Sequence, residues 1–191
     1  MNSKDIILDS LRSAGAEQFP RPDLSSIETE AMKYDDIYAQ FCAAVKGAGG
    51  NVVPQNGSLD ETLRRIYPDA VRVASTVDGC TGFNPDALAT PGELDGTDVA
   101  VMKGEFGVAE NGAVWLQQNF RHRALLFIAE ALVIVLAKDA IVGNMHDAYL
   151  RLGEVPTGYG IFISGPSKTA DIEQALVFGA HGARRLTVIV K

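Results

Sequence analysis

The chain contains little cysteine. Cys42 and Cys80 are the only two among 191 residues, and no Cys-x-x-Cys pair occurs. A structural zinc site or an iron–sulfur cluster needs several thiolates at short spacing, so this chain has too little sulfur for either. We therefore predict no metal and no cofactor in the chain itself. Such sparse cysteine is also typical of a reducing compartment.

Basic residues and long apolar runs are also scarce. There are 17 Lys and Arg against 24 Asp and Glu, a formal net charge of -7. This balance argues against a nucleic-acid or anionic-membrane surface, because phosphate binding needs clustered Lys and Arg. The apolar stretch 124–137 contains Glu130 and falls short of the roughly 20 residues that span a bilayer. The N-terminal segment carries acidic residues in an amphipathic pattern, unlike a signal peptide, so we expect a cytoplasmic protein without a membrane span.

What the chain does contain is an alternation of apolar strands and helices. Residues 1–34 predict an N-terminal helix and a connecting arm, and residues 35–191 predict one α/β domain. An Asn-Gly turn at 111–112 indicates a β-hairpin within 98–117. We predict a three-layer α/β/α fold with a mixed, mostly parallel sheet. Further strands are expected at 51–54, 70–75, 124–129, 132–137, 159–164 and 186–190, and further helices at 145–152 and 169–179. Asp35 or Asp36 is expected to cap a helix that ends at Gly47, and Ser58 with Glu61 has the pattern of a capping box for a helix that ends before Pro68. Residues 78–97 are rich in glycine and are expected to form a long loop.

The first candidate site is the turn that follows the expected strand 159–164. Gly165 and Pro166 would end the strand, and Ser167 or Thr169 could cap the first turn of a helix. Free backbone N–H groups there, together with Lys168, could instead hold a carboxylate or a phosphate. On the chemistry of these residues alone, a helix cap and an anion site are about equally good interpretations. A position beyond the carboxyl end of a strand in an open α/β sheet favours the anion site.

The second candidate site is the segment 103–112. Lys103, Glu105 and Glu110 lie close together in sequence, beside the Asn111-Gly112 turn. A partly buried Glu110 could act as an acid, a base or a nucleophile. The alternative is that Glu110 and Asn111 merely complete a hairpin turn.

A third candidate is the basic group just before residue 124. Arg121 and Arg123 flank His122, and two guanidinium groups could bind a carboxylate, although basic clusters at strand ends are more often simply solvated. His181 follows Gly179 at the expected end of the helix 169–179, where a cation is favoured without any ligand. Three scattered histidines do not make a metal site.

Two of these segments resemble a known family. The sequences GPSKTADIE at 165–173 and FGVAENGAVWL at 106–116 are similar to segments of the LUD-domain family of lactate utilization protein C-like proteins. The similarity extends over about residues 35–191. The family usually has Thr where this chain has Asn111, and Thr or Ser where it has Ala113, whereas Glu110 and Gly112 are retained. Ligand contacts made by those hydroxyls would therefore be lost here.

The resemblance implies a fold like that of ribose-5-phosphate isomerase, glucosamine-phosphate deaminase and the CoA transferases. It also implies an accessory role in oxidising L-lactate to pyruvate, beside partner proteins that carry iron–sulfur clusters. We expect a small carboxylate or phosphate ligand between the turn at Gly165 to Thr169 and the segment 103–112, with Arg121 and Arg123 as counter-charges. The alternative is a free-standing enzyme that acts on a sugar phosphate or an acyl-CoA through Glu110.

Overall fold

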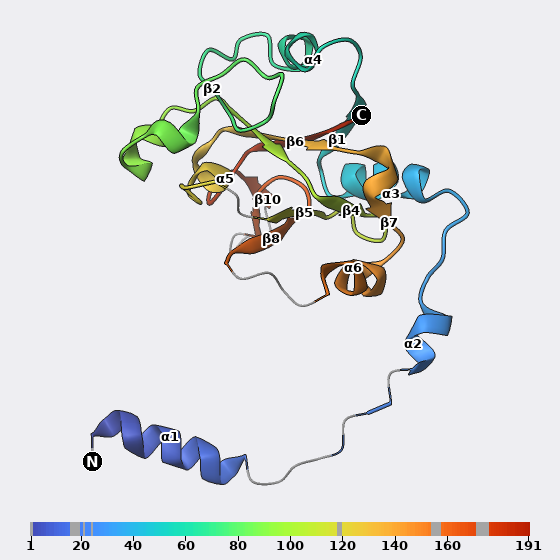
Figure 1. Ribbon diagram of the computed structural model, residues 1–191, viewed down its shortest axis with the longest axis vertical. Coiled ribbons are helices and arrows are strands. Elements are labelled where there is room, and N and C mark those ends of the chain that lie inside the picture. Colours follow the sequence, from blue (N-terminus) through green and yellow to red (C-terminus); the bar gives the residue numbers. More distant parts are fainter. Residues whose placement is uncertain are drawn as a thin grey trace. The chain divides into compact units, whose positions relative to one another are not determined.

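The structure is a computed structural model that describes residues 2–15, 20, 22–23, 25–117, 120–153, 158–170 and 176–191. The chain divides into two units, Met1–Ala31 and Met32–Lys191. Figure 1 shows the ribbon of both. Within the described residues, no helix is long and apolar enough to cross a membrane.

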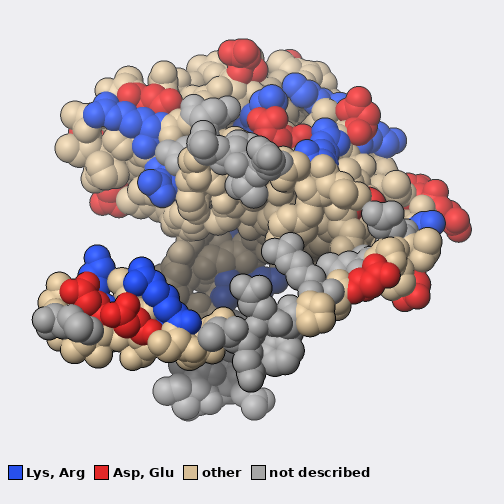
Figure 2. Space-filling model, turned by 60° about the horizontal axis from the view of Figure 1, so that its bottom comes forward, with Lys and Arg blue, Asp and Glu red and all other residues tan. Residues whose placement is uncertain are grey.

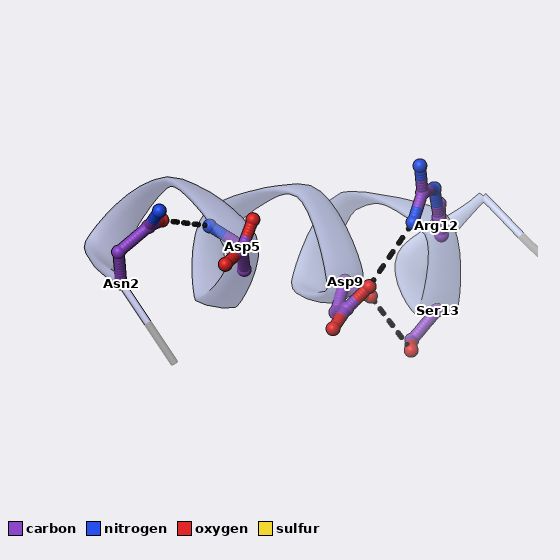
Figure 3. Close-up of polar contacts among 5 residues, drawn as sticks. All are labelled: Asn2, Asp5, Asp9, Arg12 and Ser13. Atoms are coloured by element: carbon purple, nitrogen blue, oxygen red, sulfur yellow. Dashed lines mark hydrogen bonds and ion pairs between the residues drawn. The ribbon is translucent and has the colours of Figure 1, made fainter.

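The first unit holds helix α1 (Ser3–Ala14) and the short helix α2 (Ser25–Glu30). The Asn2 side chain caps α1 by accepting a hydrogen bond from the Asp5 N–H at 2.9 Å, and Asp9 forms an ion pair with Arg12 (Figure 3). The apolar side chains of α1 are exposed; that of Leu11 is 63% exposed. The amphipathic helix expected at the N-terminus is confirmed.

A five-stranded parallel sheet forms the centre of the second unit. Its strand order is β1-β11-β6-β3-β2, and every neighbouring pair is parallel. The two longest strands are apolar and almost wholly buried, as expected for strands that are covered on both faces. The five strands are β1 (Asn51–Pro54), β2 (Val73–Ser75), β3 (Val99–Lys103), β6 (Ala131–Leu136) and β11 (Arg185–Val190).

Alternate residues of this sheet face two separate hydrophobic clusters. On one face, Leu63 of helix α4 (Leu59–Ile66) belongs to the same hydrophobic cluster as Val101 and Val133. A capping box between Ser58 and Glu61 starts this helix, as the sequence indicates. On the other face lie helix α3 (Ile37–Gly47), which starts at its N-cap Asp36, and a second sheet. Figure 1 shows α4 above the central sheet and the second sheet below it.

The second sheet has four strands in the order β7-β4-β5-β8. Strands β4 (Phe106–Val108) and β5 (Val114–Gln117) form the hairpin expected at Asn111-Gly112. β5 pairs antiparallel with β8 (Gly160–Ile163), and β4 pairs parallel with β7 (Ile141–Val142). Helix α6 (Met145–Leu152) packs on this sheet through Ala148 and through Tyr149, which lies 6.2 Å from the Phe162 ring.

Short helices complete the second unit. The expected long loop 78–97 contains the 3-10 turns η1 (Pro85–Ala87) and η2 (Pro91–Leu94). A third turn, η3 (Lys138–Ala140), follows β6. The α/β class and the mostly parallel central sheet are confirmed. The expected hairpin lies in the separate second sheet, so the layer beneath the central sheet is largely made of strands.

Two expected elements are wrong. Residues 124–129 were expected as a strand, but Leu125–Ile128 form helix α5, in which the Ile128 N–H donates to the Ala124 carbonyl at 2.9 Å. A short, continuously apolar run carries no period that separates a buried strand from a buried helix. The helix expected at 169–179 is replaced, where described, by β9 (Lys168–Ala170) and β10 (Leu176–Phe178), which pair antiparallel. Residues 171–175 lie outside the described part of the chain.

Candidate functional site

The hairpin turn at 110–112 lies against the second half of helix α3. Gly112 has φ +67°, and a Cβ there would lie 2.6 Å from the Val45 backbone nitrogen. Glycine is therefore required by both the turn and the close approach of the helix. Asn111 accepts a hydrogen bond from the Ala113 N–H at 3.0 Å through its own side chain. Both residues have a structural role, whether or not they also contact a ligand.

The turn that follows β8 packs on the C-terminal end of the same helix. The Ser164 hydroxyl donates to the Asn111 carbonyl at 2.7 Å and so links this turn to the hairpin. Gly165 has φ +71°, and a Cβ there would lie 2.2 Å from the Ala48 carbonyl oxygen. Lys168 donates to that same oxygen. The lysine that the sequence suggested for anion binding thus binds a carbonyl at the C-terminal end of a helix, where cations are favoured.

A cavity of about 240 Å³ lies beside this turn. Ser164, Pro166 and Ser167 line one part of it, and His181 lines another. The rest of its wall is mostly apolar and includes Leu126, Leu132, Phe162 and Leu186. We call it the turn cavity. It combines an apolar wall with two hydroxyls and an imidazole, which suits a small ligand with one polar end.

The turn cavity adjoins the amino ends of two central strands. Leu132 is the second residue of β6, and Leu186 is the second residue of β11. Ligands in open parallel sheets usually bind beyond the carboxyl ends. The turn was expected to lie beyond the carboxyl end of a strand in such a sheet. This expectation is wrong, because β8, which leads into the turn, pairs antiparallel with β5 in the second sheet.

Glu110 holds the start of helix α6. Its Oε2 accepts a hydrogen bond from the Met145 N–H at 2.8 Å, next to the N-cap residue Asn144. Its own N–H donates to the Gly143 carbonyl at 3.0 Å. A carboxylate at a helix N-terminus is favourable and needs no substrate. This geometry gives Glu110 a structural role and does not favour it as a catalytic base.

We expect Glu110→Ala to destabilise the protein and Glu110→Gln to destabilise it much less. Alanine removes the acceptor for the Met145 N–H, whereas the glutamine amide oxygen keeps one. Loss of a helix-capping acceptor costs about 0.5–2 kcal/mol. Urea unfolding of both variants measures the difference. Equal and negligible losses would show that the bond contributes nothing and would leave the carboxylate free for chemistry.

The other predicted site residues lie apart from the turn cavity, since none of them lines it. Lys103, the last residue of β3, forms a 3.5 Å ion pair with Glu105 at the carboxyl end of that strand. The Arg121 backbone N–H donates to Asp86 at 2.7 Å, and its side chain donates to the Leu88 carbonyl at 3.2 Å. Arg123 lies over the Tyr159 ring at 5.0 Å. Thr169 lies in β9.

Of the residues with polar side chains that line the turn cavity, Ser167 was predicted as a site residue, and Ser164 and His181 were not. Ser164 gave no signal beyond its place before Gly165, and His181 was assigned only to a helix end.

On the face shown in Figure 2, Lys and Arg are interspersed with Asp and Glu. Among the described residues, no group of three or more His, Cys, Asp or Glu is placed to hold a metal ion.

The fold and these segments identify the class of protein. The family model described as "LUD domain" matches residues 92–190, more than half of the chain, and the chain belongs to this family. The matched range contains both the hairpin turn and the turn that follows β8. The resemblance seen in the sequence is therefore confirmed.

Curated relatives extend the similarity beyond that range. "Lactate utilization protein C" of Geobacillus sp. (strain WCH70) is 28% identical over 98% of this chain and 79% of its own length. The protein of the same name from Anoxybacillus flavithermus is 29% identical over 98% of this chain and 81% of its own length. A crystal structure of a DUF162 family protein from Deinococcus radiodurans shares the fold, with a TM-score of 0.65 and 19% identity. It covers 83% of this chain and 98% of that one.

Proposed function

We propose that this protein is an accessory component of L-lactate utilisation, in which lactate is oxidised to pyruvate. The observation that carries this proposal is the similarity, over 98% of the chain, to two proteins that are both named lactate utilization protein C. Membership of the LUD domain family supports the same reading. The expected similarity of the fold to that of ribose-5-phosphate isomerase and the CoA transferases stays a prediction.

We place a small carboxylate or phosphate ligand in the turn cavity. Ser164, Ser167 and His181 bring hydroxyl and imidazole groups to an otherwise largely apolar wall. His181 is exposed, and its imidazole can donate a hydrogen bond to an anion. The apolar part of the wall suits the methyl end of a lactate-sized molecule.

Iron–sulfur partner proteins form the second half of this proposal. Oxidation of lactate to pyruvate removes two electrons, and these need an acceptor. The chain has two cysteines, Cys42 and Cys80, whereas an iron–sulfur cluster commonly uses four. The acceptor would therefore lie in another protein, and this chain would bind the ligand or organise the complex.

We expect deletion of the gene to abolish or strongly slow growth on L-lactate as the sole carbon source. Growth on pyruvate should stay normal, because pyruvate is the product of the missing step. A plasmid copy of the wild-type gene should restore growth on lactate. Equal growth of the deletion strain and its parent on lactate would contradict the proposal.

Complementation with variants tests the turn cavity separately. His181→Gln and Ser167→Ala should restore growth on lactate poorly, although the protein accumulates to the wild-type level. Lys103→Gln is the control, because it removes an exposed charge that does not line the cavity. Full rescue by all three variants would keep the pathway assignment and contradict the ligand site.

A further inference from the structure

A second and larger cavity lies on the opposite face of the central sheet. Its volume is about 640 Å³, within the range of about 300–1,000 Å³ that is usual for small-molecule sites. Helix α4, the edge strand β2 and the loop 81–83 enclose it, and we call it the α4 cavity. Apart from Val99, its lining residues precede the range that the LUD domain model matches.

The wall of the α4 cavity is mainly apolar and partly aromatic. Leu63 and Tyr67 reach it from α4 and its C-terminal cap, and Phe83 reaches it from the loop. Tyr67 is buried and its hydroxyl is already bonded to Thr187 at 2.9 Å, so the ring supplies surface more than polarity. These side chains suit a ligand with a flat, apolar body.

Arg72 brings a positive charge to this wall. Its guanidinium lies 4.6 Å from the centre of the Phe83 ring, and one terminal nitrogen donates to the Glu93 carbonyl. Its Nε is buried and has no hydrogen-bond partner among the described residues. An atom this deeply buried is out of reach of a cavity occupant, so an anion would be attracted by the positive charge of Arg72 and not through its Nε.

The remaining charges leave the α4 cavity positive. Asp60 lines it, but its two carboxylate oxygens accept hydrogen bonds from the Thr81 backbone N–H, at 2.7 Å, and from the Thr81 hydroxyl. These bonds lower the pKa of Asp60. Arg64 also lines the cavity, is exposed, and forms no ion pair within the described part of the chain. Arg64 also interacts with Asp60, and Arg72 with Asp98, and in each case the arginine charge adds to the hydrogen bonds that lower the pKa of the carboxyl. The side chains that line the cavity still carry one more positive than negative charge.

We propose that the α4 cavity is a binding site for an organic anion with a flat apolar body. The apolar body would lie against Leu63, Tyr67 and Phe83, and the anionic group would bind Arg72 and Arg64. This site is distinct from the turn cavity. Leu63, Tyr67 and Val99 of its wall belong to the cluster on one face of the sheet, whereas Leu126, Leu132 and Leu186 of the turn cavity belong to the cluster on the other face. The proposal for the α4 cavity is independent of the proposed role in lactate utilisation and would stand if that role were disproved.

The test uses two fluorescent probes with the same rings and different charge. Anilinonaphthalene sulfonate is anionic, and phenylnaphthylamine is its neutral counterpart. Titrations of the full chain should show that Arg64→Gln weakens sulfonate binding about 2- to 5-fold, as for an exposed ion pair. Arg72→Met should weaken it about 10-fold or more, because its charge is partly buried. Neither change should affect the neutral probe.

Two further variants serve as controls. Arg65→Gln removes the same charge from the neighbouring position of α4, but Arg65 does not line the cavity, so both probes should bind as to the wild type. Ala70→Phe fills the cavity and should weaken both probes. If Arg72→Met fails to fold, the comparison of sulfonate binding by Arg64→Gln and by Arg65→Gln still tests the proposal. The proposal is overturned if Arg64→Gln and Arg65→Gln weaken sulfonate binding equally, or if Ala70→Phe binds both probes as the wild type does.

Discussion

Gly165→Ala is expected to destabilise the protein by about 3 kcal/mol or more. An alanine Cβ at this position would lie 2.2 Å from the Ala48 carbonyl oxygen, and the backbone there has φ +71°. The positive φ alone costs about 1–2 kcal/mol for a residue with a side chain. Relief of the contact would move the turn away from helix α3 and would also break the bond from Lys168 to Ala48. Chemical denaturation measures the loss.

Gly49→Ala is the matched control for this prediction. Gly49 lies at the same contact and has φ +86°, but a Cβ there would meet Pro166 at 3.6 Å, an ordinary contact distance. It should lose only the cost of the positive φ, about 1–2 kcal/mol. If the two variants lost the same free energy of unfolding, the close approach of the turn to α3 would not be a determinant of stability.

Phe41→Ala is expected to cost about 3–5 kcal/mol, the range for removing a fully buried aromatic ring. Phe41 belongs to helix α3 and is 0% exposed. Its ring packs against the second sheet, where a Cβ on Gly107 would lie 2.9 Å from it. The surrounding strands are paired in a sheet and cannot collapse far into the space left. The free energy of unfolding from urea titration gives the value.

Ile37→Ala on the same helix is the comparison for Phe41. Ile37 is 39% exposed, so its truncation leaves little or no cavity and should cost less than about 1 kcal/mol. A Phe41→Ala variant as stable as Ile37→Ala would mean that α3 does not anchor the two sheets to each other. Because the candidate turns contact α3 at Val45 and Ala48, that result would also weaken the account of how they are positioned.

Local signals in the sequence predicted the elements whose causes are local. The capping box of Ser58 and Glu61 starts α4, Asp36 caps α3, and the Asn111-Gly112 pair makes the hairpin. The apolar run at 132–137 became the central strand β6. In each case a few neighbouring residues hold the hydrogen bonds or the burial that decide the structure.

The strand pair of β9 and β10, where a helix was expected, depends on contacts between distant residues. Ser167 and Thr169 are good helix caps, but the Ser167 N–H donates to the Ala183 carbonyl and the Gly179 N–H donates to the Ser167 carbonyl. These bonds, at 2.9 and 3.0 Å, tie the segment into a strand pair. Such pairing outweighs a preference of about 1 kcal/mol for a cap.

The candidate site was only partly predicted, because it too is assembled from segments that are distant in the sequence. The turn at Gly165 and the hairpin turn at Asn111 were both identified, and the structure links them through Ser164. Lys103 and Glu105 are close to Glu110 in sequence, yet they lie at the carboxyl end of β3. The α4 cavity gave no sequence signal, because its lining comes from separate segments, each with an ordinary pattern.

The strand order has a consequence for how the protein is made. β1 pairs with a single strand, β11, which ends at Val190, and β11 also separates β1 from β6. During synthesis, β1 leaves the ribosome long before β11 and cannot join the sheet until residues 185–190 have been made. Until then its backbone groups stay unpaired. A ribosome stalled before residue 185 would hold a chain whose central sheet cannot close, which exposes it to chaperones and proteases.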